Sequence, residues 1–308
     1  MAERNRVLST RTIAWWGTGI VLLAAVAAAL LLWLLGGGTP ADSSRLDALR
    51  TASTLVVGTG GAAALLLAAR KQRSAELDLE QKDHDATERR ITDMYGKAAD
   101  QLGSDKAPVR LAGLYALERL AQSHADQRQT IVNVLCAYLR MPFEPAAEGS
   151  LEELQVRKAA QRILMLHLRP GSEAEPMGSY WPDIDLDFSG ARLVALTLTH
   201  CRIRSIVCYQ TEFEEFATFR DTEFGTKADF HEAVFRDRAD FRNAVFGGNG
   251  DVFRGTQFEK HAEFGVNSKA GLAGALAKPG YKRSWPPGWT EEPGNDGWLR
   301  LLPSSVSE

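Results

Sequence analysis

The sequence predicts a chain of the α + β-solenoid class, with a helical membrane anchor, a helical middle domain and a solenoid. Three observations support this. Two uncharged runs lie within the first 70 residues, apolar residues at helical spacing follow, and large apolar residues then recur at steps of five or six. The predicted domains are residues 1–73, 74–172 and 183–266, followed by a Pro- and Trp-rich tail at 267–308.

The overall composition excludes several classes of protein. The 308 residues include 36 Lys+Arg and 39 Asp+Glu, which give a net charge of -3, and 44% of the chain is hydrophobic. These values exclude a wholly disordered chain, a collagen and a disulfide-dense secreted scaffold. The near-neutral balance argues against a nucleic-acid binder, which usually has a basic excess. Only three cysteines occur, which fits a reducing compartment.

The first uncharged run, Ile13 to Leu35, predicts a transmembrane helix. Its 23 residues would extend about 35 Å as a helix, enough to cross a bilayer core of about 30 Å. Trp15, Trp16 and Trp33 lie near its two ends, as in an aromatic belt. A signal peptide is the alternative, with small residues near Ala41 as a cleavage site, but its apolar region is usually shorter.

A second uncharged run at 51–69 predicts a weaker span, rich in Ala and Gly and bounded by Arg50 and Arg70. Its VVGTGG segment is a poor nucleotide loop, because no strand–turn–helix unit surrounds it. Three Lys or Arg precede the first span, two lie between the spans and three follow the second. This bias predicts a multi-pass protein of the plasma membrane with both termini in the cytoplasm.

The middle of the chain predicts helices. Residues 74–90 are polar nearly all round, as in a solvated stalk or a weak coiled coil. A helical stripe then runs from Ile91 to Leu102, and further helices are expected after Ser104, near 127–140 and near 150–168. The segment after Ser104 resembles the second helix of a HEAT-type repeat, although a simple bundle is the alternative. His124 and His167 are interpreted as surface or capping residues.

From residue 185 onward, large apolar residues recur with steps of five, then of alternating six and five, with one step of seven. Neither the 3.6 period of a helix nor the 2.0 period of a strand explains these steps. A solenoid does, because each short side inserts one residue into the interior. The expected core ladder is Phe188, Leu193, Leu198, Ile203, Cys208, Phe213, Phe219, Phe224, Phe230, Phe235, Phe241, Phe246, Phe253, Phe258 and Phe264.

Two residues before most ladder positions stands a small side chain, as in Ala228-Asp229-Phe230 and Ala239-Asp240-Phe241. This pattern resembles the A(D/N)Lxx motif of the pentapeptide-repeat family. The resemblance implies a right-handed quadrilateral β-helix with four units per coil, hence about four coils. The order of segments is similar to membrane-associated pentapeptide-repeat proteins of high-GC Gram-positive (actinobacterial) type. The step of six departs from the family's strict five.

No motif indicates catalysis, a cofactor or a metal site, so we expect a non-enzymatic scaffold that binds a protein partner at the membrane. The alternative is a DNA mimic that inhibits or protects a type II topoisomerase, an activity known for some pentapeptide-repeat proteins. Acidic clusters at 183–187 and 212–215 are more typical of solvated faces than of cation sites. The tail is interpreted as a cap over the last coil or as a partner-binding segment, and a homo-oligomer is left open.

Overall fold

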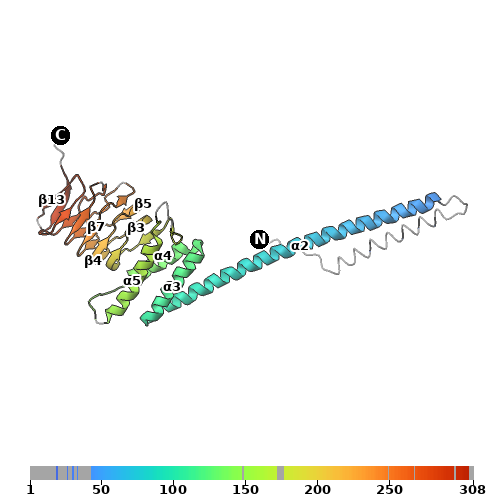
Figure 1. Cartoon of the computed structure of the whole chain (residues 1–308), viewed down its shortest axis with the longest axis horizontal. Coiled ribbons are helices and arrows are strands. Elements are labelled where there is room, and N and C mark those ends of the chain that lie inside the picture. Colours follow the sequence, from blue (N-terminus) through green and yellow to red (C-terminus); the bar gives the residue numbers. More distant parts are fainter. Residues whose placement is uncertain are drawn as a thin grey trace. The chain divides into compact units, whose positions relative to one another are not determined.

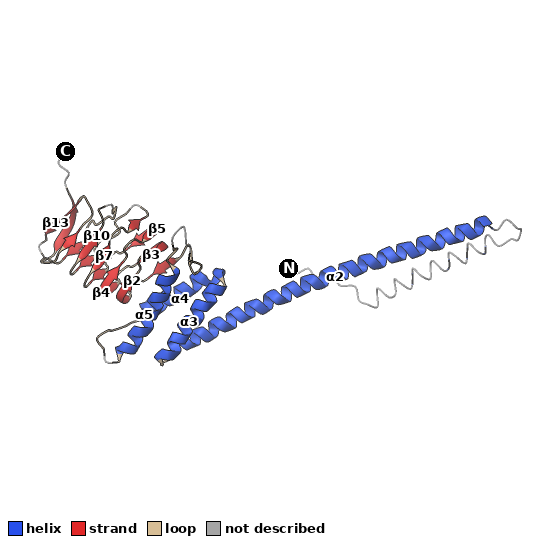
Figure 2. Cartoon of the chain, in the orientation of Figure 1, coloured by secondary structure: helices blue, strands red, loops and turns tan. Residues whose placement is uncertain are grey.

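The computed structural model describes residues 43–304, apart from 148, 172–176, 249, 267 and 295, together with residues 19, 26, 30 and 33. The chain divides into two compact units, residues 1–86 and 87–308 (Figures 1 and 2).

The first unit contains most of helix α2, Ser43–Leu102. The first predicted span, 13–35, falls almost wholly outside the described residues, and it stays a prediction. The second, 51–69, is helical throughout, and the side chains of the stalk at 74–90 are exposed. In the part of the chain that the structure describes, we found no helix of sufficient length and apolarity to traverse a bilayer.

The second unit begins with four packed helices. The end of α2 is joined by α3 (Ala107–Ser123), α4 (Arg128–Arg140) and α5 (Ser150–His167), with a short 3-10 helix, η1 (Ala125–Gln127), before α4. Ile91 and Leu102 of the predicted stripe are buried. Gly113 lets α3 approach α2 closely, because a Cβ there would lie 2.8 Å from the carbonyl oxygen of Ala98.

A β-solenoid of about five turns follows, with its coils stacked in parallel register, and this confirms a repeat architecture. Successive coils pair β1–β3–β5–β8 on one side and β2, β4, β6, β7, β9, β10, β11 and β12 on the others. The strands are β1 Asp185–Asp187, β2 Arg192–Thr197, β3 Arg202–Val207, β4 Glu212–Thr218, β5 Glu223–Asp229, β6 Val234–Phe235, β7 Ala239–Phe241, β8 Val245–Phe246, β9 Gln257–Phe258, β10 Ala262–Phe264, β11 Leu276–Ala277, β12 Arg283–Ser284, β13 Trp289–Pro293 and β14 Leu299–Pro303.

The solenoid is about one turn longer than the four coils expected from the sequence. The additional turn comes from the tail, in which β11 pairs in parallel with β9 and β12 pairs in parallel with β10. Leu272 and Ala277 continue the interior and are buried. The step from Phe264 to Leu272 spans eight residues, and this irregular spacing hides the last turn from a search for steps of five or six.

The alternation of five and six reflects two kinds of corner. At the five-residue step from Phe219 to Phe224 the chain makes a β-turn: the Thr222 amide donates to the carbonyl of Phe219 at 3.3 Å, and Asp221 between them has φ 55°. At the six-residue step from Phe213 to Phe219 one strand, β4, continues around the corner instead. There the register slips, since Val194 pairs with Glu214 but the residue two positions on, Leu196, pairs with residue 217. The sixth residue therefore belongs to the bent corner.

The ladder residues fill the interior in four columns. Of the fifteen, fourteen are buried and Phe246 is partly buried. Rings stack along a column, as between Phe213 and Phe235, whose centroids are 4.5 Å apart at an interplanar angle of 4°. Rings of neighbouring columns meet edge to face, as do Phe230 and Phe241 at 5.5 Å and 83°. Both geometries are favourable for aromatic pairs.

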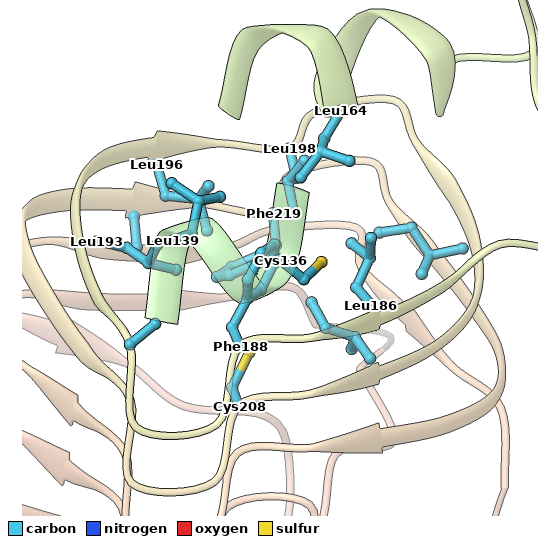
Figure 3. Close-up of a cluster of buried hydrophobic side chains, with 14 of the residues drawn as sticks. Cys136, Leu139, Leu164, Leu186, Phe188, Leu193, Leu196, Leu198, Cys208 and Phe219 are labelled. Carbon is cyan, nitrogen blue, oxygen red and sulfur yellow. The ribbon is translucent and has the colours of Figure 1, made fainter. Parts of the chain in front are cut away.

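Both ends of the solenoid are covered. At the first coil, Leu139 of α4 and Leu164 of α5 lie in one apolar cluster with Leu193 and Leu198 (Figure 3). At the last coil, β14 pairs antiparallel with β11, and β13 pairs with β14. The outer strand β13 exposes two glutamates and ends in a proline, which disfavour pairing with another strand.

Candidate interaction surface

Outward side chains form rows along the stacked strands. On the face made by β2, β4, β6, β9 and β11 the charges alternate in sign. Arg192 contacts Glu212 at 2.9 Å, and Arg236 of the next coil contacts the same carboxylate at 2.8 Å. Further along, Lys278 contacts Glu259 at 2.9 Å. Ion pairs therefore connect successive coils on this face.

The arginines keep the central carboxylate of this row ionised. Burial acts to raise the pKa of Glu212, but hydrogen bonds and charge from Arg236 and Arg192 outweigh burial and hold it below its ordinary value. Exposed pairs of this kind contribute about 0–1 kcal/mol each to stability. The row therefore fixes the pattern of charge on the face more than it stabilises the fold.

A second closed network lies on the face made by β7 and β10. Asp240 contacts Arg242 at 2.6 Å, and Glu263 contacts Arg238 at 2.9 Å and Arg242 at 3.1 Å. The Asp240 side chain is only 9% exposed. Because these carboxylates already have cationic partners, the face is unsuited to taking up a free metal ion.

Two hollows on the described part of the second unit have volumes of about 600 Å³ and 440 Å³. The larger lies between the α4–α5 loop and the first two coils, and it is lined by Arg140, Met141, Pro142, Phe143, Glu144, Gly190, Ala191, Arg192, Gln210 and Glu212. The smaller lies over a corner of coils two to four and is lined by Arg220, Asp221, Arg242, Asn243, Phe264, Gly265 and Val266. Both are shallow and bordered by ion-paired side chains, and the larger is also lined by Met141 and Phe143.

The acidic clusters that stood out in the sequence are engaged by arginines, and Glu212 and Glu214 share Arg192 and Arg236. Asp185 pairs with Arg204 on β3, whereas Asp187, two residues on, pairs with Arg140 of α4. Glu215 occupies a corner with φ 59°. Within the described ranges, no group of three or more His, Cys, Asp or Glu side chains is arranged to hold a metal ion.

The three cysteines are free and buried. Burial raises the pKa of the Cys136 thiol to about 12 and that of Cys201 to about 12, and it raises the pKa of Cys208 well above its ordinary value. A thiol of such high pKa is a poor nucleophile at neutral pH. These side chains therefore act as packing groups.

One histidine differs from its interpretation as a surface or capping residue. His167 is only 5% exposed. Its ring stacks on Trp181 with centroids 3.9 Å apart, and its Nε2 lies 2.8 Å from Glu118 Oε1. The sequence contains no sign of this site, because Glu118, His167 and Trp181 are brought together only by the packing of α3, α5 and the segment that follows α5.

A scan against protein-family models gave no match, and searches of curated proteins and of solved structures gave none either.

Proposed function

We propose that this protein is a non-enzymatic interaction scaffold, anchored to the plasma membrane by its N-terminal segments and related to the pentapeptide-repeat proteins. One observation supports the scaffold role most directly: both ends of the solenoid are covered, so its lateral faces are the surfaces left to a partner. A capped solenoid cannot extend end to end, and its stacked coils hold the lateral side chains in fixed rows. Such rigid rows suit recognition of another protein.

The membrane and family parts of the proposal rest on the sequence. The 23 uncharged residues at 13–35, the Trp residues at their ends and the flanking arginines support an anchor. The four columns, the small residues before each ladder position and the stacked coils support the pentapeptide-repeat relationship. We place both termini in the cytoplasm, where the cell keeps thiols such as Cys136 reduced.

The alternative proposal, a DNA mimic acting on a topoisomerase, has weaker support. A mimic needs rows of unpaired negative charge that resemble phosphates. On the two faces described above the carboxylates are paired with Arg or Lys, as Glu212 is with Arg192 and Arg236. A supercoiling assay with gyrase and the full chain would support mimicry if it showed inhibition.

Proximity labelling tests the scaffold. A labelling enzyme is fused to the C-terminus of the full chain, and enriched proteins are compared with those of a double variant, Tyr209→Ser with Phe216→Ser. These two aromatic side chains of the second coil are 42% and 44% exposed. Tyr115→Ser, on the exposed side of α3, is the matched control.

We expect one or more partners to be enriched by the parent chain and the control, and lost from the double variant. An identical set of labelled proteins for all three chains would contradict recognition by this part of the solenoid. A reporter fused after Arg73 tests the topology separately, and activity outside the cell would overturn the cytoplasmic assignment.

A further inference from the structure

The segment that leads from α5 into the solenoid is held at its centre by His167. The ring Nδ1 lies 2.6 Å from the carbonyl oxygen of Ser179, and Nε2 lies 2.8 Å from Glu118 Oε1 on α3. The Trp181 amide donates to the His167 carbonyl at 2.7 Å. This histidine therefore connects α3, α5 and residues 177–184, which we call the lead-in segment.

The two partners of the imidazole are both acceptors. A backbone carbonyl has no hydrogen to donate, and neither has an ionised carboxylate. A neutral imidazole has a single N–H, so it can satisfy only one of these contacts. The two contacts need two hydrogens. A neutral His167 supplies one and an ionised Glu118 supplies none, so one further proton is required. We propose that this shared proton is a latch, which makes the attachment of the lead-in segment to the helices dependent on pH.

The surroundings of the ring favour positive charge. Trp181 lies flat against it, at 3.9 Å and 6° between planes, and a cation over an indole face is stabilised. His167 also belongs to the last turn of α5, where the helix dipole favours a cation. Trp181 is fully buried, and its Nε1 donates to Gln122 Oε1 at 2.9 Å, so the stacked ring is fixed in place.

Glu118 is the charged group that faces the ring. On the C-terminal side of α5, Arg169 is turned toward the Thr199 carbonyl at 2.8 Å. From the solenoid, the Cys201 thiol approaches α5, and burial raises its pKa to about 12, so that it stays neutral. In the lead-in segment itself, burial raises the pKa of Tyr180, which is also neutral.

Loss of the proton would leave a nitrogen lone pair facing an oxygen across less than 3 Å, beside a ring that is only 5% exposed. A neutral imidazole has one N–H for these two acceptors, so the latch weakens at a pH where histidine is neutral. The lead-in segment also closes the first coil, since the Arg204 amide donates to the Ile184 carbonyl at 2.9 Å. Release would therefore uncover the first coil and the surface of α5.

Hydrogen exchange of the full chain, read by mass spectrometry, tests the latch at about pH 6 and about pH 9, on either side of the ordinary histidine range. Rates are corrected for the intrinsic pH dependence of exchange. We expect residues 177–184 of the parent chain to exchange at least about tenfold faster, relative to the intrinsic rate, at the higher pH. His231→Gln, which removes a partly buried His–Asp pair on the solenoid (side chains 36% and 17% exposed), is the matched control and should behave as the parent does.

Glu118→Gln separates the latch from a purely structural contact. The glutamine amide can donate to the bare Nε2 of a neutral imidazole, so this variant should keep its protection at both pH values. Selective 15N labelling of histidine gives a second readout, with two ring N–H signals assigned to His167 by their loss in His167→Gln. Equal protection of the parent chain at both pH values would overturn the proposal, as would a parallel loss in Glu118→Gln.

Discussion

The first coil of the solenoid and the coils after it fill the same four columns with different side chains. In the first coil the columns hold Phe188, Leu193, Leu198 and Ile203, whereas in the third all four hold phenylalanine. The coils also differ in length. Position 192 pairs with 212, 20 residues on, but 212 pairs with 234, 22 residues on. The added residues lie at the bent corners, and the longer perimeter accompanies four rings per coil.

This difference follows what each coil must contact. The first coil meets the helices, and its aliphatic side chains pack with Leu139 and Leu164 (Figure 3). In the coils between the first and the last, rings stack in register along the columns, as Phe219 does on Phe241 at 4.9 Å and 9°. Aliphatic groups adapt to a helical surface, whereas aromatic stacks require a repeating neighbour. The type of side chain in a column thus depends on whether the neighbouring element is a helix or another coil.

The largest effect is expected from a substitution at the centre of the aromatic stack. Phe241 stacks on Phe219 and Phe264 and meets Phe230 and Phe253 edge to face. Phe241→Ala should cost about 3–5 kcal/mol, since a large cavity in a column of rings cannot collapse easily. Native-state hydrogen exchange of the strands on either side measures the loss.

Leu198 lies in the same column as Phe241 but in the first coil, and Leu198→Ala is the variant to compare with Phe241→Ala. It should cost about 2–4 kcal/mol, because α5 can move toward the gap. A larger loss for Leu198→Ala than for Phe241→Ala would show that the helical cap, and not the aromatic stack, is the more rigid neighbour.

Most of the solenoid can be predicted from the sequence because each interior residue sits at a fixed step from the last. The ladder from Phe188 to Phe264 and the small residues before it follow from that spacing alone. The same reasoning misses the last turn, where the step to Leu272 is eight residues and Trp285 takes the place of a ladder phenylalanine against Phe264, at 5.7 Å. A spacing rule fails wherever a loop length changes.

The second prediction concerns the residue after a ladder position on the β3–β5–β8 side. Arg204 holds this position in the first coil and Gly247 in the third. A Cβ at Gly247 would lie 1.9 Å from the carbonyl oxygen of Gly225 and 2.6 Å from that of Phe224. Gly247→Ala should therefore cost about 1–3 kcal/mol, because backbone must move. Arg204→Ala, at an exposed side chain, should cost under about 0.5 kcal/mol. Thermal unfolding of the two variants measures the difference, and equal midpoints would contradict a steric need for glycine at position 247.

The polar contacts between the helices and the start of the solenoid could not be predicted from the sequence. Helical spacing places Glu118 and Gln122 on one side of α3, but it does not say what they meet. Their partners, His167 and Trp181, are 49 and 59 residues away. Tertiary packing alone creates such sites, whereas the core columns are local features of the chain.

The third prediction compares the position before the ladder residue on the β4–β7 side, which is Thr218 in the second coil and Asp240 in the third. Burial acts to raise the pKa of Asp240, but hydrogen bonds and charge from Arg242 and Arg238 lower it overall. Its folded pKa is below its unfolded value of about 3.9, so its stabilisation is present at neutral pH and is lost as pH falls through the folded value.

Arg242→Leu should remove about 1–2 kcal/mol at neutral pH, a moderate figure because Arg242 is 41% exposed and screened by water. The difference from the parent should shrink below about pH 4, where Asp240 becomes protonated. Urea unfolding across this pH range measures both effects. A difference that stays constant with pH would show that Arg242 acts by packing. Thr218→Val, in the second coil, should leave the pH dependence unchanged.

The smallest expected effect concerns the small residue two positions before the ladder, Cys201 in the first coil and Thr222 in the second. Thr222 Oγ1 donates to the Leu198 carbonyl at 2.6 Å, within the core. Thr222→Val keeps the shape but removes the donor, so it should cost about 1 kcal/mol. Cys201→Ala removes a sulfur with only long contacts, at 3.5 and 3.9 Å, and should cost less than a lost buried hydrogen bond. Exchange of the Cys201 amide reports the difference, because it lies 3.4 Å from Thr222 Oγ1. Faster exchange in Thr222→Val alone would show that hydroxyls bind the coils together where threonine replaces the cysteine of the first coil.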